Sequence, residues 1–412
     1  MIRRLNDARF SSVFFVTALF PSIALAAPAD ADQETAADVF KPYADLRYRL
    51  ETVDQDGLSR DATASTLRIK VGIETAEWNG FSAKVEGEAI ANVGKEKFND
   101  TLNGLTQFPV VADPEDVVLN QAYVRWRHDG IVDAKAGRQI INLDNQRWIG
   151  SVGWRQNDQT MDAALVTVTP ARDFSATYGY SWRVQRIFGP DSPRGTFRNN
   201  DIHMIRASYG APVIGNITAY AYLLDIPNAP AASSQTYGVR LAGNQDLGGA
   251  KLLYVAEYAR QSSYGTNPAS FRHDYLLLEP GIAVGPVTVK LGLERLEGDG
   301  TTALQTPLAT LHKFNGWADK FLNTPANGLR DIYGDVMVKP KGPKWLKGTT
   351  FRALYHNYKS TRGNLDYGQE WNFLIARSFG RHVSVSLKYA DYNSDGFATD
   401  TQKFWFSTQL KF

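Results

Sequence analysis

The amino-acid sequence predicts an all-β fold, a transmembrane antiparallel β-barrel, and three observations support this prediction. Apolar and polar residues alternate along many short segments, no run of eighteen apolar residues follows the N-terminal region, and tight connections alternate with long ones. A membrane protein without long apolar helices must cross the bilayer as strands, which show apolar side chains to lipid at every second position. We predict eighteen strands, with sixteen as the alternative.

The N-terminal residues have the pattern of a secretory signal peptide. Basic residues come first, a short apolar core follows at 12–19, and Ala24-Leu25-Ala26 forms a small-x-small cleavage site. The apolar core is too short for a membrane anchor. The predicted organisation is a signal peptide at 1–26, a periplasmic linker at 27–39 and the barrel at 40–412.

The net charge of the chain is close to zero. The sequence holds 45 basic and 43 acidic residues, and cleavage removes three Arg and one Asp, so the formal charge falls from +2 to 0 (42 basic, 42 acidic). Any ion preference must therefore come from where the charges lie. The lack of cysteine excludes disulfides, thiolate metal sites and thiol nucleophiles.

The first strands set the pattern for the rest of the chain. In 40–51, Leu46 and Leu50 lie in one phase and charged residues in the other, and 67–74 and 81–93 repeat this alternation. Such a strand has one face for lipid and one for water. Further strands are predicted near 118–128, 132–141, 160–169, 174–186, 202–210, 216–224, 235–243, 250–260, 274–283, 287–296, 330–339, 349–358, 369–378, 383–391 and 402–412.

The connections between these strands alternate in length. Tight turns are predicted at 129–130, 170–172, 210–215, 285–286 and 379–382, and long loops at 94–117, 142–159, 187–201, 225–234, 261–273 and 297–329. Short periplasmic turns and long external loops are typical of outer-membrane barrels, and an even strand number places both termini in the periplasm. A longer basic turn at 339–348 is the exception.

Aromatic residues mark the predicted strand ends and the last strand. Rings at strand ends favour an interfacial girdle over packing in a soluble sheet: Tyr178, Tyr180, Trp182, Tyr254, Tyr258, Tyr355, Tyr358, Trp371, Tyr389 and Tyr392. Phe404, Phe406, Leu410 and Phe412 share one phase of the last strand. This ending resembles the signal that barrel-assembly machinery reads, and we expect the strand to close against 40–51.

Two segments resemble the alginate-export family of outer-membrane porins. The first is GRQIINLDNQRWIG at 137–150, followed by Trp154-Arg155 and by TMDA at 160–163; the second is LHKFNGWADKF at 311–321, followed by GLRDIY at 328–333. The resemblance implies an eighteen-stranded barrel whose long loops fold over a narrow basic channel. In the best-known member that channel passes an anionic polysaccharide.

The polar phase of the strands should line the lumen with cations. The expected lining residues are Arg47, Arg49, Arg68, Lys70, Arg125, Arg127, Arg138, Arg183, Arg206, Arg240, Lys290 and Arg352, with Arg377 and Lys388 in addition. Inward acids are fewer, and rings of Arg and Lys favour anions. The alternative is that arginines and glutamates form cross-strand ion pairs that only fill a polar interior.

Two loops are candidates for a constriction. In the third external loop these are Asp144, Arg147, Trp154 and Arg155, where we expect Asp144 to orient the arginines; in the seventh they are His312, Lys313, Trp317, Asp319 and Lys320. The alternative is a salt-bridge network that pins each loop to the barrel wall.

The sequence favours a porin that passes anionic solutes, either organic acids or acidic sugars and oligosaccharides, by diffusion. The alternative is an export conduit for an anionic polysaccharide such as alginate, with a periplasmic partner docked near 339–347. We expect no enzyme, because no histidine lies in a catalytic motif, and no cofactor or metal, because the calcium-like run at 391–396 has Gln402 at its twelfth position. We expect a monomer in the outer membrane of a Gram-negative bacterium, in contact with lipid and lipopolysaccharide and not with nucleic acid.

Overall fold

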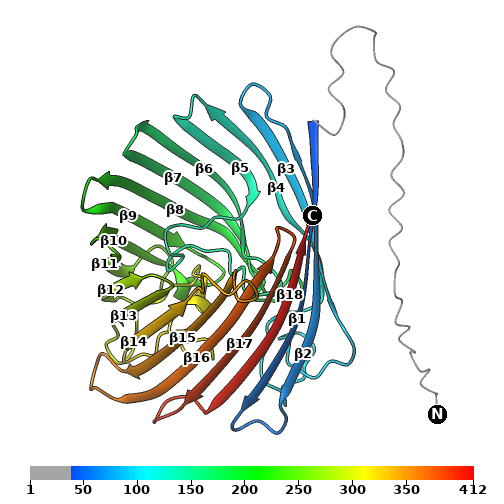
Figure 1. Ribbon diagram of the computed structural model, residues 1–412, viewed down its shortest axis with the longest axis vertical. Coiled ribbons are helices and arrows are strands. Elements are labelled where there is room, and N and C mark those ends of the chain that lie inside the picture. The colour runs from blue at the N-terminus through cyan, green and yellow to red at the C-terminus, as the bar shows by residue number, and fades with distance from the viewer. Residues whose placement is uncertain (1–38) are drawn as a thin grey trace, which may run out of the picture.

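A closed barrel of eighteen antiparallel strands forms the protein, as Figure 1 shows. The computed structural model describes residues 39–412. The predicted fold class and strand number are confirmed, and every predicted strand is present. The predicted signal peptide at 1–26, and the linker up to residue 38, lie outside the described residues.

Most strands extend beyond their predicted ends. Their bounds are β1 Phe40–Gln55, β2 Ala62–Thr75, β3 Phe81–Asn92, β4 Asp116–His128, β5 Val132–Gln139, β6 Thr160–Ala171, β7 Phe174–Gln185, β8 Thr196–Ala211, β9 Gly215–Asp225, β10 Ser234–Asp246, β11 Ala250–Ser263, β12 Arg272–Val284, β13 Val287–Leu296, β14 Leu329–Val338, β15 Thr349–Lys359, β16 Asp366–Phe379, β17 Val383–Asn393 and β18 Thr401–Lys411. Two short 3-10 helices, η1 (Pro230–Ala232) and η2 (Leu311–Lys313), lie in loops. Among the described residues, no helix has the length and apolarity needed to cross a bilayer.

The barrel closes where the first strand meets the last. β1 pairs with β18 from Asp45 opposite Lys411 to Gln55 opposite Thr401. The backbone N–H groups of Ala44 and Phe412 each donate to the other residue's carbonyl, at 3.1 and 2.9 Å. Closure leaves no free sheet edge in the membrane, where an unpaired backbone group would be costly. The predicted pairing of the terminal strand with 40–51 is confirmed.

Long loops leave one end of the barrel and short turns leave the other. Three long loops matter below: L2 (93–115), L3 (140–159) and L7 (297–328), numbered as external loops in chain order. Figure 1 shows segments of the cyan-to-green and yellow parts of the chain crossing inside the ring of strands. The predicted alternation of short turns and long loops is confirmed, including the longer turn between β14 and β15.

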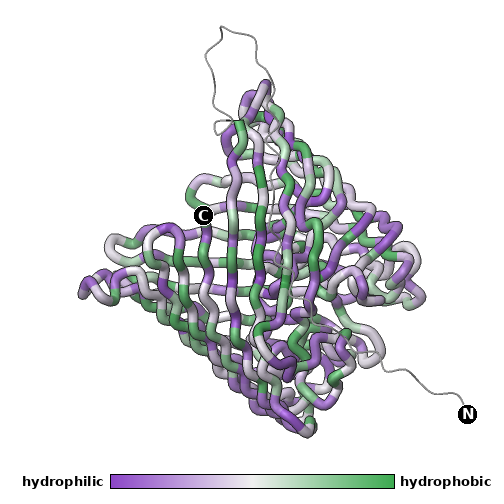
Figure 2. Tube along the Cα trace, turned by 90° about the vertical axis from the view of Figure 1, so that its right-hand side faces the viewer, coloured by the Kyte–Doolittle hydropathy of each residue, from purple (hydrophilic) through white to green (hydrophobic). Residues whose placement is uncertain are grey.

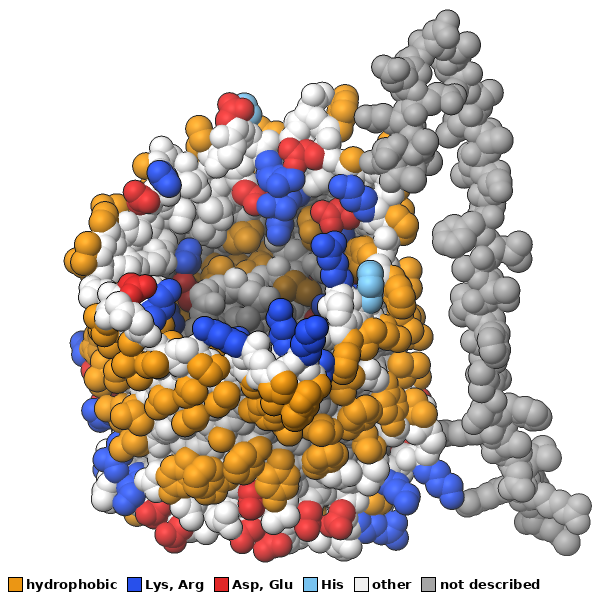
Figure 3. Space-filling model, viewed as in Figure 1, with side chains coloured by type: hydrophobic (Ala, Val, Ile, Leu, Met, Phe, Trp, Pro, Cys, Tyr) orange, Lys and Arg blue, Asp and Glu red, His pale blue; other side chains and the backbone are white. Residues whose placement is uncertain are grey.

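The outer surface of the wall is apolar. Val71, Leu291 and Phe373 point outward and are 60, 64 and 44% exposed. Figure 2 shows hydrophobic and hydrophilic residues alternating along the strands, and in Figure 3 hydrophobic side chains form a band around the wall while Lys and Arg surround the hollow. This is the surface that a bilayer requires of a barrel.

The aromatic girdle prediction is wrong for two tyrosines. Trp182, Tyr258 and Trp371 are 42, 48 and 45% exposed on the outer wall, as a girdle requires. Tyr358 and Tyr392 are fully buried inside the barrel, with ring centroids 4.4 and 6.0 Å from that of Phe321 in L7. They lie in the inward phase of their strands, and L7 packs over them.

Candidate channel and constriction

L3 and L7 fold into the barrel and contact each other along their backbones. The Gly150 N–H donates to the Leu308 carbonyl at 2.9 Å, and the Thr310 N–H donates to the Gln146 carbonyl at 3.1 Å. A Cβ on Gly150 would lie 2.3 Å from the Thr310 hydroxyl, so this close approach requires glycine. The two loops therefore act as one layer across the lumen.

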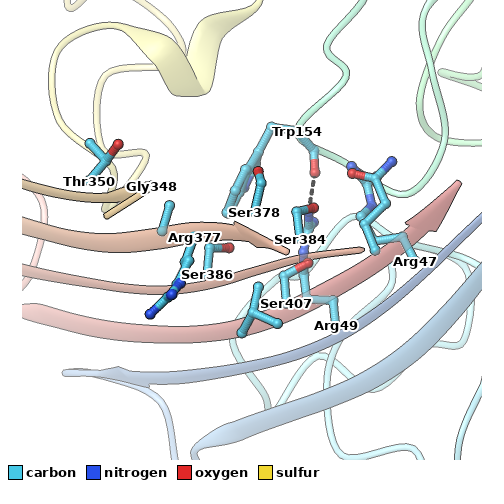
Figure 4. A pocket seen from close by; sticks show the side chains of 13 residues that line it. Arg47, Arg49, Trp154, Gly348, Thr350, Arg377, Ser378, Ser384, Ser386 and Ser407 are labelled. Atoms are coloured by element: carbon cyan, nitrogen blue, oxygen red, sulfur yellow. Dashed lines mark hydrogen bonds between the residues drawn. The ribbon is translucent and has the colours of Figure 1, made fainter. Parts of the chain in front are cut away.

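Strand β1 fixes L3 through successive inward side chains. Arg47 donates from Nε to Gln156 Oε1 and from Nη1 to the Gly153 carbonyl, both at 2.9 Å, and from Nη2 to the Arg155 carbonyl. Arg49 donates to the Trp154 carbonyl, and its guanidinium lies 4.2 Å from the centroid of that indole (Figure 4). Residues two apart on a strand share a face, so both arginines reach the same loop segment.

Asp319 of L7 is the centre of a buried charge cluster. Its carboxylate accepts from Arg155 Nη2 of L3 at 3.2 Å, from Lys403 Nζ of β18 at 3.0 Å and from His312 Nδ1 at 2.8 Å. Arg155 also contacts Glu51 of β1 at 3.1 Å. Burial alone would raise the pKa of Asp319, but the contacts with His312, Lys403 and Arg155 hold it well below the ordinary value, so the carboxylate is ionised.

Lys388 of β17 lies between indole rings beneath this cluster. Its Nζ is 3.9 Å from the Trp154 ring centroid, 3.8 Å from that of Trp317 and 5.2 Å from that of Trp405. Its Nζ also lies 2.7 Å from His312 Nε2. Cation–π contacts of this kind become stronger as water is excluded. We call Trp154, His312, Trp317, Lys388 and Trp405 the aromatic cluster.

Carboxylates of the wall anchor the backbone of L7. Glu370 of β16 accepts from the backbone N–H groups of Trp317 and Ala318 at 2.5 and 2.8 Å. Asn315 donates to Glu294 of β13 at 2.7 Å. A buried carboxylate costs a large desolvation free energy unless donors surround it, and here the turn of the loop supplies them. L7 is therefore fastened at 315–319.

Two hollows lie on either side of the layer that L3 and L7 form. The periplasmic hollow has a volume of about 330 Å³, and Arg47, Arg49, Trp154 and Arg377 line it (Figure 4). The external hollow has a volume of about 490 Å³, and Arg155 and Lys320 are among its lining residues. Trp154 lines the first hollow and its neighbour Arg155 lines the second, so this part of L3 separates the two.

Comparison with solved structures identifies the fold. Three solved structures from Pseudomonas aeruginosa resemble it: OpdK with vanillate (14% identity, 90% of this chain and 98% of that one, TM-score 0.69), OccK2 (OpdF) in complex with glucuronate (14%, 90 and 98%, 0.66) and OpdO (15%, 91 and 98%, 0.70). The chain has the fold of outer-membrane porins. No protein-family model matches it, nor does any curated protein.

The comparisons do not support the predicted resemblance to the alginate-export family. No family model supports that resemblance, and the structural neighbours are channels of the OpdK kind. The segments that suggested it, 137–150 and 311–321, meet inside the barrel, where Arg147 donates to Asn315 and Lys313 donates to the Asn145 carbonyl. The predicted strand number and the inward-folding loops are present without it.

Most of the predicted lining cations are paired with carboxylates. Ten of the twelve have a carboxylate oxygen within 4 Å: Arg49–Asp113, Arg68–Asp45, Lys70–Glu88 and Asp158, Arg125–Asp133, Arg127–Glu77, Arg138–Asp162, Arg206–Asp144, Arg240–Glu257, Lys290–Glu279 and Arg352–Asp335. The two without one among residues 39–412 are Arg47 and Arg183. Pairing with carboxylates, the alternative interpretation, therefore describes most of the predicted lining cations.

The structure corrects two lining residues, Arg138 and Arg183. Arg138 pairs in register with Ala122 and Asp162, whose neighbours Gln121 and Ala163 face the interior, so Arg138 points outward. Arg183 is opposite Asp162 because the sheet has a bulge at Trp182. A bulge adds one residue and reverses the inward and outward phases beyond it.

The predicted constriction residues come together, with one altered contact. Arg147 contacts Glu294 at 3.1 Å and donates to Asn315 at 2.9 Å, so it joins L3 to β13 and L7. Asp144 does not orient Arg147 or Arg155, because it binds Arg206 of β8 at 2.8 Å. The prediction that Asp144 organises the arginines of its own loop is wrong.

Lys313 and Lys320 extend from L7 into the spaces beside the constriction. Lys313 Nζ donates to the Asn145 carbonyl at 3.0 Å. Burial lowers the pKa of Lys313, and the nearby Arg240 and Arg352 lower it further. Burial and Lys403 lower the pKa of Lys320, in the external hollow, to about 8.

Several residues of the constriction were not predicted from the sequence. Glu51, Glu370 and Trp405 are buried at the loop contacts, and Asp113 of L2 lies 3.6 Å from Arg49 and 3.8 Å from Arg155. Glu51, Glu370 and Trp405 do lie in the polar phase of their strands. Their partners are loop residues far away in the sequence, and the strand pattern carries no signal for that pairing.

Proposed function

We propose that this chain is an outer-membrane porin that passes small anionic solutes, with L3 and L7 as its constriction. The observation that carries the proposal is the charge of the two hollows. The residues that line the periplasmic hollow include three arginines and no carboxylate. Those of the external hollow include Arg155, Arg186, Arg194, Lys320 and Lys403 against Asp319. A cation excess on both sides of a narrow passage favours anions.

The lining also supports a class of solute. Guanidinium groups bind carboxylates with two parallel hydrogen bonds. Ser378, Ser384, Ser386 and Ser407 lie beside the arginines in the periplasmic hollow and offer hydroxyls to a polar solute (Figure 4). Organic acids and acidic sugars have these groups, and two of the similar structures are complexes with vanillate and glucuronate.

The size of the hollows supports small solutes over a polymer. Volumes of about 330 and 490 Å³ are those of sites for single small molecules. L3 and L7 are fastened to β1, β13, β16 and β18 by the contacts described above. Export of an anionic polysaccharide would need these contacts to break together, so we place uptake or exchange of small anions first.

The proposal includes the route to the membrane. The predicted signal peptide would export the chain, and Phe404, Phe406, Leu410 and Phe412 would be read during assembly. Phe404 and Phe412 are 38 and 67% exposed on the outer face of β18, where an assembly factor or lipid can reach them. We propose that the chain acts in transport, without an enzymatic reaction or a cofactor. The outer-membrane bilayer would surround the barrel wall.

Reversal potentials in planar bilayers test the proposal. With a salt gradient across a membrane that holds the purified porin, we expect the potential to follow the anion. Carboxylates such as glucuronate should reduce the chloride current when added to one side. Cation preference, or no conductance even after deletion of the inward segments of L3 and L7, would contradict the proposal.

A further inference from the structure

Three cations lie side by side on the outer wall of the barrel. Arg295 of β13 is in register with Arg330 of β14, and Arg330 is in register with Lys359 of β15. The next pair in the ladder, Glu294 and Asp331, is buried inside the barrel. Since neighbours along a strand point to opposite faces, the three cations point outward.

This cation row, formed by Arg295, Arg330 and Lys359, lies at the external edge of the apolar band, next to the long loops. On the same face, closer to the periplasmic end, Leu291, Ile332 and Val336 are 64, 49 and 42% exposed. The eight residue-to-residue steps from Val287 to Arg295 cover ~26 Å along the strand, or ~20 Å along the membrane normal for a tilt of ~40°. That height is comparable to the apolar band of an outer-membrane barrel, so the cations reach the headgroup level on the side of the long loops.

The residues next to the row agree with this level. Tyr355 is two outward positions below Lys359, and its ring centroid lies 4.8 Å from that of Trp371 on β16. Aromatic rings of this kind mark the boundary between hydrocarbon and headgroups. The cation row therefore lies on the external side of the aromatic pair Tyr355 and Trp371.

The charge of the row is only partly compensated. Arg295 has Glu297 at 3.6 Å and Lys359 has Asp366 at 3.4 Å. Arg330, in the middle, donates to the Asn364 amide oxygen at 3.0 Å and has no carboxylate within 4 Å among residues 39–412. Like charges directly opposite each other destabilise a sheet, so an anion bound between them would stabilise it.

We propose that the cation row binds the phosphate groups of lipids in the outer leaflet. A guanidinium binds phosphate through two hydrogen bonds, and long basic side chains at this level place their charge among headgroups while their methylenes stay on apolar wall. The three adjacent strands, neighbours in Figure 1, hold the charges at fixed spacing. The site is separate from the lumen, so it does not depend on the proposed transport.

Native mass spectrometry of the detergent-purified barrel tests this site. The probes are a bisphosphorylated lipid A and the same lipid without phosphates. We expect the native barrel to prefer the phosphorylated lipid by about tenfold, the effect of one charge-assisted hydrogen bond or more. Arg330→Gln should remove most of this preference, and Arg330→Gln with Lys359→Gln should remove the rest.

A matched control lies at the same end of the barrel. Arg260 of β11 also points outward, but Asp274 neutralises it with contacts at 2.7 and 3.0 Å. The double variant Arg260→Gln, Asp274→Asn should keep the lipid preference, and heat-modifiable migration on gels should show that every variant is folded. Equal binding of both lipids to the native barrel, an unchanged preference in Arg330→Gln, or displacement of the lipid by millimolar inorganic phosphate would overturn the proposal.

Discussion

Lys388 donates a hydrogen bond from Nζ to Nε2 of His312 across 2.7 Å, and this contact joins the wall strand β17 to the loop L7. The ionised carboxylate of Asp319 can only accept, so in the neutral ring Nδ1 carries the proton and Nε2 is the acceptor. Nδ1 donates its proton to Asp319 at 2.8 Å. Burial lowers the pKa of His312 to about 3 despite the carboxylate, which agrees with a neutral ring.

The neutral His312 predicts how acid affects stability. Its folded pKa of about 3 lies below its ordinary value of 6.5, so between these values the unfolded chain binds a proton that the folded chain does not. Stability should therefore fall as the pH drops from 6.5 towards 3. His312→Gln can keep both hydrogen bonds without titrating, so its thermal midpoint should depend less on pH in this window. Identical pH profiles for the two proteins would contradict the assignment.

Removal of Trp154 should open the constriction. Trp154 lines the periplasmic hollow, stacks on His312 at 4.6 Å and contacts Lys388, so Trp154→Ala removes most of the layer at that point. Because the narrowest point limits the current, we expect single-channel conductance to rise by about twofold or more. Trp345→Ala is the control, since Trp345 is 69% exposed on the turn between β14 and β15. Equal conductance in both variants would show that Trp154 does not limit the current.

Reversal of the charge at Arg377 should reduce anion preference. Arg377 lines the periplasmic hollow and donates to the Trp345 carbonyl, with no carboxylate within 4 Å in the described part of the chain. Arg377→Glu should shift the reversal potential towards that of the cation. Arg183→Gln, on the outer wall, should leave it unchanged. An effect of Arg183→Gln as large as that of Arg377→Glu would contradict the outward orientation of Arg183.

Loss of Arg155 should destabilise the constriction. Arg155→Met would leave Glu51, Asp113 and Asp319 buried without this partner. Removal of one member of a buried ion pair costs about 3–5 kcal/mol, and here the cost falls on the loop contacts. We expect faster protease cleavage within L3 and larger current fluctuations, while Arg155→Lys should preserve part of the cluster. Protease resistance equal to that of the native chain would show that the cluster does not hold L3.

The strands could be predicted from the sequence wherever apolar and polar side chains alternate regularly. All eighteen strands could be predicted because lipid and water impose a period of two on each of them. The predicted facing failed at Arg183, because the bulge at Trp182 depends on packing between strands. It also failed at Arg138, which was assigned to the polar phase but shares the face of β5 with Val132, Ala134 and Ala136.

The constriction was predictable only in part. Trp154, Arg155, Trp317 and Asp319 could be expected from their place in long loops. Their partners could not, because Arg155 and Glu51 are 104 residues apart and Asp319 and Lys403 are 84 apart. These pairs depend on the loops folding into the barrel, and the local sequence pattern does not show which strand residues a loop will contact.

The contacts of Asp319 also set an order of events during assembly. Lys403 belongs to β18 and Arg155 rests on Glu51 of β1, and these two strands form the seam where the sheet closes. Before β1 pairs with β18, Lys403 and Glu51 lie on opposite edges of an open sheet. The full set of contacts around Asp319 can therefore form only once β1 has paired with β18, so this part of the constriction is completed last.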